Sequence, residues 1–166
     1  MKLFKNLVIP LLILLMSLYV FFGVKSQKHS SGSAFVYFVK VNHKGNLILA
    51  PVKRKIGFKQ KVLNRAIVEL FKGPSLQERK IGYFTEIPPK TKLLEIKQSD
   101  DKIIINLSKD FATGGGSTSM GMRFKQLKAT VYGNVKHKKV YLEINGKKVD
   151  SIGGEGVEIT QPLADK

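Results

Sequence analysis

The chain has 166 residues, which suits one compact domain with short appendages. It contains no cysteine, and this excludes a disulfide framework, a thiolate metal site, a cysteine nucleophile and a lipidated cysteine anchor. The formal net charge of +17 attracts polyanions such as nucleic acid, anionic lipid headgroups or anionic wall polymers, unless the lysines serve only to keep the surface solvated.

The N-terminal part carries an uncharged apolar run that begins at Leu7 and ends at Val24. A helix of that length reaches about 27 Å, close to the roughly 30 Å of a bilayer's hydrocarbon core. Residues 1–25 are therefore predicted to be a signal anchor or a cleavable signal peptide. The residues around position 25 fit a cleavage site only loosely, so we expect the segment to be retained as an anchor.

Charge does not fix the orientation of this segment, because lysines such as Lys5 and Lys25 lie on both of its flanks. A leader with a short basic head normally leaves the following domain outside, and we expect that arrangement here. Residues 26–33 are polar and predict a flexible linker to a domain over residues 34–150. The expected location is the cell membrane, with one pass and an extracytoplasmic domain, or the exterior if the leader is cleaved.

The first half of the domain predicts a hairpin and a helix. Residues 34–41 are β-branched and aromatic, and a turn joins them to a second predicted strand over 47–53. Pro51 marks that second strand as an edge or as its end. Gly73 then ends a helix whose apolar side chains recur at the spacing of one helix face: Val62, Leu63, Ala66, Ile67, Leu70 and Phe71.

The second half begins with a long connection, residues 75–91, that is predicted to be mostly irregular. Strands over 92–98 and 102–107 are predicted to form a second hairpin. A second helix is expected to begin near Ser117 or Thr118, either of which can cap it. Its apolar stripe comprises Met120, Phe124, Leu127 and Val131.

A further strand is predicted over residues 139–145, and the pair Asn145 and Gly146 is typical of a hairpin turn. Residues 151–166 are predicted to be a C-terminal tail with one short strand over 157–160. The order of elements indicates an α+β fold, in which two helices pack on one face of a mixed, largely antiparallel sheet.

Six short motifs follow one another across roughly residues 35–147. They are the opening strand Val36-Tyr37-Phe38, the helix end Leu70-Phe71-Lys72-Gly73-Pro74, the approach to the second hairpin Ile87-Pro88-Pro89-Lys90-Thr91-Lys92-Leu93, the strand end Ile105-Asn106-Leu107-Ser108-Lys109-Asp110-Phe111, the second helix Gln126-Leu127-Lys128-Ala129-Thr130-Val131, and the closing strand and turn from Val140 to Gly146. Together they resemble the GerM (sporulation and germination) domain family.

The resemblance implies an exported domain without enzymatic activity, used in envelope or sporulation assembly and similar in fold to ring-building modules of secretion-like complexes. Two features depart from the family. Asn106 stands where the family commonly has aspartate, and this chain relies on its apolar segment where the best-known members look like lipoproteins.

Residues that bear chemistry are scattered along the chain. The three histidines, His29, His43 and His137, have no ligand-type spacing, so we expect no metal and no cofactor. The glycines at 114–116 precede a helix, where anions bind, but they lack the lysine and hydroxyl residue that complete a P-loop, so a plain flexible connection is the preferred interpretation.

The acidic residues predict turns rather than catalysis. Asp100 and Asp101 are adjacent and point apart, while Ser108 and Asp110 resemble a turn cap. We therefore expect no catalytic residue. A structure that placed Ser108, Asp110 and His137 within hydrogen-bond reach would revive a hydrolytic hypothesis.

Basic residues gather in clusters that are either a solvated surface or contacts to an anionic polymer or lipid. The candidate contacts are Lys53, Arg54, Lys55, Lys136, Lys138, Lys139, Lys147 and Lys148. Lys61 belongs to a further small cluster. Aromatic residues are not interleaved with these clusters, so a base-stacking surface is not evident and no nucleic acid is expected.

Two functions remain for the domain. The first is a membrane-anchored, non-catalytic binding or assembly module of the bacterial envelope, which would present a strand edge or an apolar patch to envelope or membrane-complex proteins or to a second copy. The second is a lysine-rich module that binds wall polymer or anionic lipid, with retention that falls steeply with salt.

Overall fold

The computed structural model describes residues 32–57, 61–153 and 156–163. The predicted leader, with Leu7 and Val24, and most of the predicted linker lie outside the described residues. None of the helices in the described ranges has the length and apolarity that crossing a bilayer requires.

The first hairpin is present as predicted. Strands β1 (Ser33–Val41) and β2 (Leu47–Lys55) pair antiparallel, in a register that runs from Ser33 opposite Lys55 to Val41 opposite Leu47. Alternation along β1 buries Ala34, Val36 and Phe38 on one face. β2 continues through Pro51 and is an edge strand, because its sheet has two strands.

Helix α2 (Val62–Lys72) also follows the sequence pattern. It buries Leu63, Ala66, Ile67 and Leu70. Gly73 ends it at a positive φ of 77°, and its backbone N–H donates to the Leu70 carbonyl over 3.1 Å. Glycine suits this position because it adopts the left-handed conformation without a Cβ clash.

The connection over residues 75–91 is mostly irregular, as expected, but it contains a short helix that was not predicted, α3 (Leu76–Lys80). A capping box begins it. The Glu78 backbone N–H donates to Ser75 Oγ over 3.2 Å, and the Ser75 N–H donates to the Glu78 carboxylate over 2.8 Å. The Ser-x-x-Glu spacing of residues 75–78 is the sequence signal for this helix.

The remaining long strands form a second, mixed sheet in the order β3-β4-β5-β6. β3 (Leu93–Gln98) and β4 (Lys102–Leu107) are the predicted antiparallel hairpin. β5 (Lys139–Ile144) pairs parallel to β4, and the Asn145-Gly146 turn joins it antiparallel to β6 (Lys147–Lys148). Both turn residues have positive φ, as that turn requires.

The connection from β4 to β5 contains the 3-10 helix η1 (Lys109–Ala112) and helix α4 (Ser117–Tyr132). Capping of α4 by Ser117 or Thr118 is wrong, because Gly116 is the N-cap and its carbonyl accepts the Met120 N–H over 2.9 Å. The apolar stripe is confirmed: Met120, Leu127 and Val131 are buried and Phe124 is half-buried.

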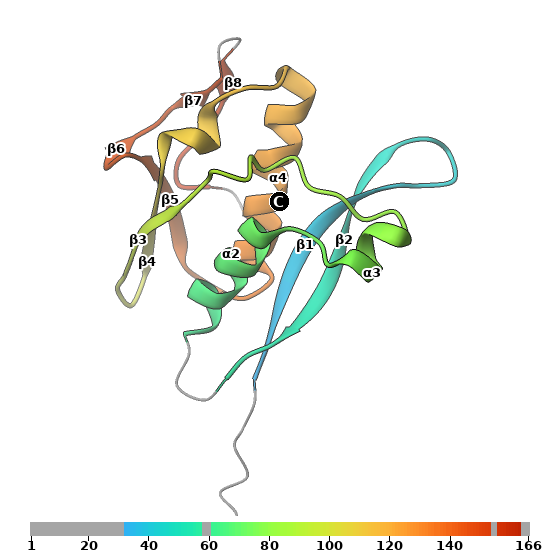
Figure 1. The fold of residues 1–166 in the computed structure, drawn as a ribbon. Helices are drawn as coiled ribbons and strands as arrows, with labels where there is room; N and C mark the ends of the chain where they lie inside the picture. The colour runs from blue at the N-terminus through green and yellow to red at the C-terminus, as the bar shows by residue number, and fades with distance from the viewer. Residues whose placement is uncertain (1–31, 58–60, 154–155, 164–166) are drawn as a thin grey trace, which may run out of the picture. The chain divides into compact units, whose positions relative to one another are not determined.

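The α+β class is confirmed, but the strands do not form one sheet with helices on a single face. Figure 1 shows α2 and α4 between the β1–β2 hairpin and the four-stranded sheet. One core joins these layers, with members from each: Val36 and Phe38 of β1, Ile67 and Leu70 of α2, Leu127 and Val131 of α4, and Ile103, Ile105 and Leu142 of the sheet.

The segment after residue 150, which the sequence sets apart as a tail, packs on this core. It contains the short strands β7 (Ser151–Ile152) and β8 (Val157–Glu158) and buries Ile152, Ile159 and Leu163. The Gln161 side chain accepts from the Leu142 N–H and donates to the Leu142 carbonyl, at 2.9 and 3.0 Å. The segment therefore lies along the edge of β5.

Candidate functional site

Five of the eight predicted basic contacts gather at the end of the domain where the chain enters β1. Lys55 lies opposite Ser33, the first residue of β1, and Lys53 lies opposite Phe35. Phe35 also binds the end of α4, since its N–H donates to Asn134 Oδ1 and its carbonyl accepts from Asn134 Nδ2, at 2.9 and 2.6 Å. These bonds bring the residues after α4, Lys136 onward, to the same end.

The start of β5 completes this group. The Lys138 ammonium donates to the Ser99 carbonyl over 2.7 Å, and the Lys139 N–H donates to the Asp101 carbonyl over 2.8 Å. The β3–β4 turn therefore lies here too, with Lys102 opposite Lys139 in the parallel register. The carboxylates that this turn brings are those of Asp100 and Asp101.

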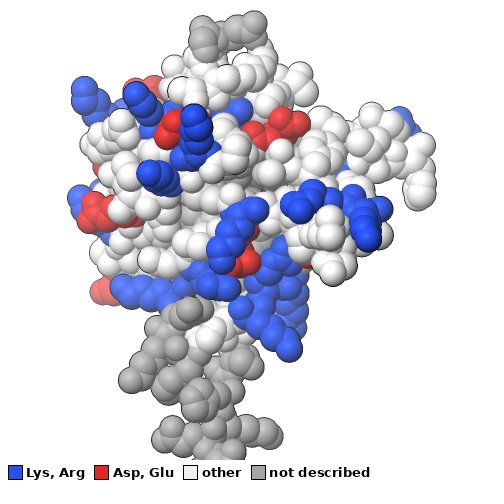
Figure 2. Space-filling view, in the orientation of Figure 1, with Lys and Arg blue, Asp and Glu red and all other residues white. Residues whose placement is uncertain are grey.

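We call this surface the basic end. Figure 1 shows that α2 also begins on this side of the domain. Figure 2 shows Lys and Arg side chains gathered along the lower margin of the visible face, where β1 begins and β2 ends. The members of the basic end are Lys53, Lys55, Lys61, Lys102, Lys136, Lys138 and Lys139.

Arg54 belongs to an internal ion-pair network instead. Its two terminal nitrogens donate to the two carboxylate oxygens of Glu78 at 2.5 and 2.6 Å, and its Nε lies 3.5 Å from Glu69. The guanidinium holds the pKa of Glu78 at about 2, well below its usual range, and the hydrogen-bonded Glu78 carboxylate in turn raises the pKa of Arg54. Arg54 thus fixes α3 and α2 to β2, and we do not count it among the lysines of the basic end.

Lys147 and Lys148 lie away from the basic end. They form β6, which follows the carboxyl end of β5, whereas Lys139 begins that strand. Six residues of strand put roughly 20 Å between the two groups. Lys148 also pairs with Asp150 over 3.5 Å. The eight predicted contacts are therefore not one surface.

A polar stripe along α4, for which the apolar pattern of the helix gave no prediction, binds the edge of β1 and the loops around the helix. Its members recur at helical spacing: Arg123, Gln126 and Thr130 on the helix, and Asn134 just beyond its C-cap. Three of them bind the outer edge of β1. The Tyr37 N–H donates to Thr130 Oγ1 over 3.1 Å, the Tyr37 carbonyl accepts from Gln126 over 3.2 Å, and Asn134 binds Phe35. The 3–4 spacing of these polar residues was visible in the sequence, but not the strand that they bind.

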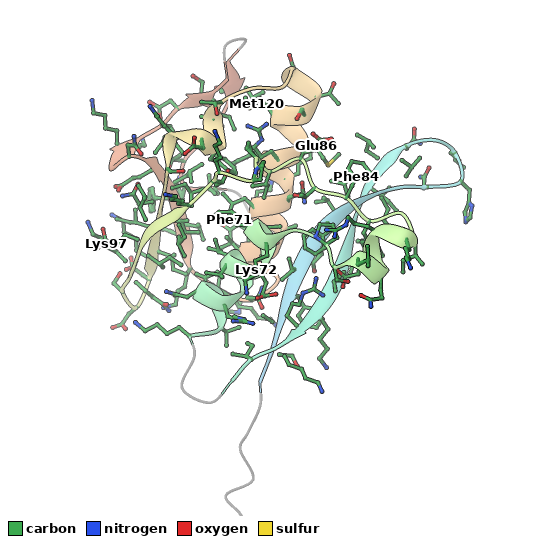
Figure 3. All side chains as sticks on the ribbon, in the orientation of Figure 1. Phe71, Lys72, Phe84, Glu86, Lys97 and Met120 are labelled. Carbon is green, nitrogen blue, oxygen red and sulfur yellow. The ribbon has the colours of Figure 1, made fainter. Side chains whose placement is uncertain are left out.

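The fourth member, Arg123, is 3% exposed and donates to backbone carbonyls. They belong to Glu86, Phe111, Thr113 and Gly114, at 2.6–3.1 Å. Figure 3 shows Glu86 on the segment that passes across α4. Burial lowers the pKa of Arg123. The side chain therefore ties this segment, η1 and the loop at 114–116 to the helix, which gives that glycine loop a structural role.

The residues of the hydrolytic hypothesis do not converge. Ser108 Oγ donates to Asp110 over 3.0 Å and accepts from the Lys92 N–H over 3.0 Å, as a turn cap does. His137 precedes β5 at the basic end, while Ser108 follows the opposite end of the paired strand β4. Asp101 accepts from Ser99 within the β3–β4 turn, as predicted. His43 lies in the β1–β2 turn.

Asn106, the residue that departs from the family motif, keeps a structural contact. Its Oδ1 accepts the Gly146 N–H over 2.9 Å and so fixes the turn between β5 and β6. An aspartate would offer an acceptor oxygen at the same place, so this bond does not depend on the departure.

Exposed apolar side chains lie on both faces of the hairpin at its other end: Val41 and Leu47 are paired on one face, and Ile48, opposite Lys40, lies on the other. Val41, Leu47 and Ile48 are 55%, 37% and 41% exposed there. The segment after α3 joins them, because Phe84 forms a β-bridge with Val39 and the Lys40 ammonium lies 4.5 Å from the Tyr83 ring. Ile81, in this segment, is 65% exposed. We call Val41, Leu47, Ile48 and Ile81 the tip patch.

The fold has known counterparts among solved structures. The tandem GerMN domains of the sporulation protein GerM from Bacillus subtilis align over 86% of this chain and 48% of their own, with a TM-score of 0.64 and 22% identity. The first GerMN domain of that protein aligns over 79% of this chain and 97% of its own, with a TM-score of 0.56 and 13% identity. This chain thus spans about half the length of the tandem structure.

A candidate lipoprotein from Clostridium perfringens aligns over 75% of this chain and 81% of its own, with a TM-score of 0.50 and 25% identity. No curated protein matches the chain significantly. Residues 35–150 match the model of the Germane family, described as sporulation and spore germination. That match covers most of the chain and most of the described fold, and it includes every motif on which the resemblance rests. The chain therefore belongs to the Germane family of sporulation and spore germination domains.

Proposed function

We propose that the chain is a non-catalytic assembly module of the bacterial envelope. Its N-terminal apolar segment holds it in the cytoplasmic membrane, and the domain on the extracytoplasmic side binds a protein partner through the tip patch. The partner is an envelope or membrane-complex protein, or a second copy of the chain.

The observation that carries this proposal is the position of the tip patch. The nine residues of β1 separate the patch from the point where the chain enters the domain by roughly 30 Å. A module tethered at one end would therefore present these apolar side chains away from the tether. Apolar groups grouped on a surface are typical of protein contacts.

The free edge of β2 is a weaker candidate for the same contact. Phe35, Tyr37 and Val39 direct their backbone groups away from β2, so their partners Lys53, Pro51 and Leu49 direct theirs outward. Proline offers no N–H, and the next outward-facing residue along the edge is Lys53. Both features protect a strand edge from pairing with another strand.

Different observations support the proposed extracytoplasmic location of the domain and its proposed lack of catalytic activity. The Clostridium perfringens relative is a candidate lipoprotein, and an extracytoplasmic position of this chain would agree with that description. Anchoring here must differ, because this chain has no cysteine to lipidate. No catalytic step is proposed, because Ser108 and His137 lie at opposite ends of paired strands.

Affinity capture of the full chain from its native membrane tests the contact. The variant Val41→Glu/Ile48→Glu places charge in the tip patch, and Val68→Glu/Leu94→Glu is the matched control on side chains of similar exposure elsewhere. We expect a protein partner that persists at high salt, is lost from the tip variant and is kept by the control. Loss of every partner at high salt, or equal capture by both variants, would contradict the proposal.

A second candidate function is polyanion binding, with wall polymer or anionic lipid as the ligand. The grouping of seven lysines at the basic end favours it. The two functions occupy different ends of the domain, so one does not exclude the other.

A further inference from the structure

We infer that the basic end rests on anionic phospholipid headgroups of the membrane that holds the N-terminal segment. This inference depends on the proposed anchoring. It adds a second contact between the protein and the bilayer, and it assigns the lysines of the basic end to lipid phosphate.

The chain enters the domain at the basic end. Ile56 at the end of β2 donates its N–H to the Gly32 carbonyl over 3.0 Å, and Lys55 lies opposite Ser33. The lysines of the basic end therefore lie around the point from which the chain leads back to the apolar segment. Any tether pulls this end toward the bilayer before any other part of the domain.

The linker between the apolar segment and the domain is short compared with the domain. The residues between Lys25 and Ser33 span at most about 25 Å when fully extended. Helix α4 begins at the far end of the domain and finishes at the basic end, and its 16 residues cover about 24 Å. If the far end contacted the bilayer, the linker would have to extend along most of the length of the domain to reach its start. The basic end is therefore the favoured contact.

The two ends of the domain also differ in charge. The basic end carries seven lysines against Asp100 and Asp101. Glu69 and Glu78, beside the end of β2, are already paired with Arg54. A carbonyl bond, as at Lys138, leaves the ammonium charge intact. The far end is mixed, because Asp110, Asp150 and Glu158 accompany its lysines. Lysines next to a membrane anchor are the arrangement that binds anionic lipid.

The experiment uses the full chain reconstituted into lipid nanodiscs. Because the chain has no cysteine, one fluorophore can be placed cleanly, by Ser99→Cys at the basic end or by Thr118→Cys in the first turn of α4 at the far end. Nanodiscs of phosphatidylcholine alone are compared with nanodiscs that also contain phosphatidylglycerol. A spin label on the lipid headgroups quenches a fluorophore that lies close to the bilayer surface.

We expect quenching of the label at residue 99, and not at residue 118, in discs with phosphatidylglycerol, and we expect it to fall at high salt. The variant Lys53→Gln/Lys55→Gln/Lys136→Gln/Lys139→Gln should lose it, because the docking equilibrium constant should drop about fivefold for each lysine removed. The control Lys90→Gln/Lys109→Gln/Lys147→Gln/Lys148→Gln removes equal charge at other exposed sites and should keep it. Circular dichroism checks that both variants fold.

Each of the following results would overturn the inference. Equal quenching in both lipids, or in both charge variants, would show that the lysines do not select anionic headgroups. If anionic lipid produces no quenching while added polyphosphate protects residue 99, the basic end binds a soluble anionic polymer instead of lipid. Release of the chain from the discs by alkaline carbonate would overturn the anchoring and this inference together, whereas a retained but unquenched chain overturns this inference alone.

Discussion

Two arginines fix segments of the domain through contacts that their neighbouring residues in the sequence do not predict. Arg54 lies between two lysines and so resembles one more surface charge, yet it binds Glu78 and Glu69. Arg123 lies in the middle of a helix and is surrounded by carbonyl groups. In both cases the partner is distant along the chain, so residue type and neighbours alone do not reveal the contact.

The Arg54–Glu78 pair makes stability depend on pH. The pKa of Glu78 falls from 4.5 to about 2 in the folded state, so between these values the unfolded state binds more protons. The stabilisation is complete above pH 4.5 and is lost as the pH falls toward 2. We expect Glu78→Gln to cost about 1–3 kcal/mol at neutral pH, and less as the pH drops through this window, in urea unfolding curves.

The matched control for that measurement is Glu95→Gln. Glu95 and its partner Lys97 are half-exposed or more, 3.4 Å apart on β3, so this substitution should cost less than about 0.5 kcal/mol. A cost for Glu78→Gln that does not change between pH 7 and pH 2.5 would contradict the assignment.

Removal of the Arg123 guanidinium tests the contribution of its bonds to the backbone carbonyl groups. Arg123→Met keeps the length of the side chain but leaves four carbonyl groups without their donor, so we expect a loss of at least about 3 kcal/mol in free energy of unfolding. Arg79→Met is the control, because Arg79 is exposed and donates to the Pro74 carbonyl over 2.6 Å. Equal costs for the two substitutions, measured by chemical denaturation, would sink this interpretation.

At the scale of elements, α4 takes the place of a third strand beside β1. Its polar side chains bind the backbone groups of Phe35 and Tyr37, while Phe84 binds those of Val39. The edge of β1 is therefore satisfied without a strand. This arrangement explains why the hairpin is separate from the four-stranded sheet and why the helices lie between the two.

Thr130→Val tests this arrangement with little change of shape. Thr130 is fully buried and its hydroxyl accepts the Tyr37 N–H, so its loss should cost about 1–2 kcal/mol. Hydrogen exchange of the Tyr37 amide should accelerate more than that of Val36, which pairs with β2. Uniform acceleration along β1 would instead indicate that the edge contact with α4 has no local effect.

The sequence predicted these elements better than their arrangement. Alternation along β1, the apolar face of α2 and the Asn145-Gly146 turn are local signals, and each element formed where expected. The short helix α3 was missed although Ser75 and Glu78 form its capping box. The parallel pairing of β4 with β5 and the division into two sheets depend on contacts between distant residues, which periodicity does not encode.

The candidate surfaces show the same limit. Sequence clusters identified five of the seven lysines of the basic end as candidate contacts, but placed Arg54, Lys147 and Lys148 with them. The tip patch had no sequence signal, because Val41, Leu47 and Ile48 read as ordinary strand residues. They are exposed because the end of the hairpin extends beyond the core.

At the scale of the whole domain, opposite ends carry different surfaces. The basic end surrounds the point where the chain enters, and the tip patch lies at the other end of β1. A tethered domain of this kind would meet the bilayer with lysines and a protein partner with apolar side chains. Lysine contacts weaken with salt and apolar contacts do not, so the two contacts are separable by experiment.

Site-specific photocrosslinking in the native membrane tests the central claim, that the tip patch binds a protein. A photoreactive amino acid replaces Ile48 in one variant and Leu94, of similar exposure on β3, in the other. The account predicts a discrete protein adduct at position 48, formed equally at low and high salt, and none at position 94. Identical adducts at both positions, or none at position 48, would contradict it.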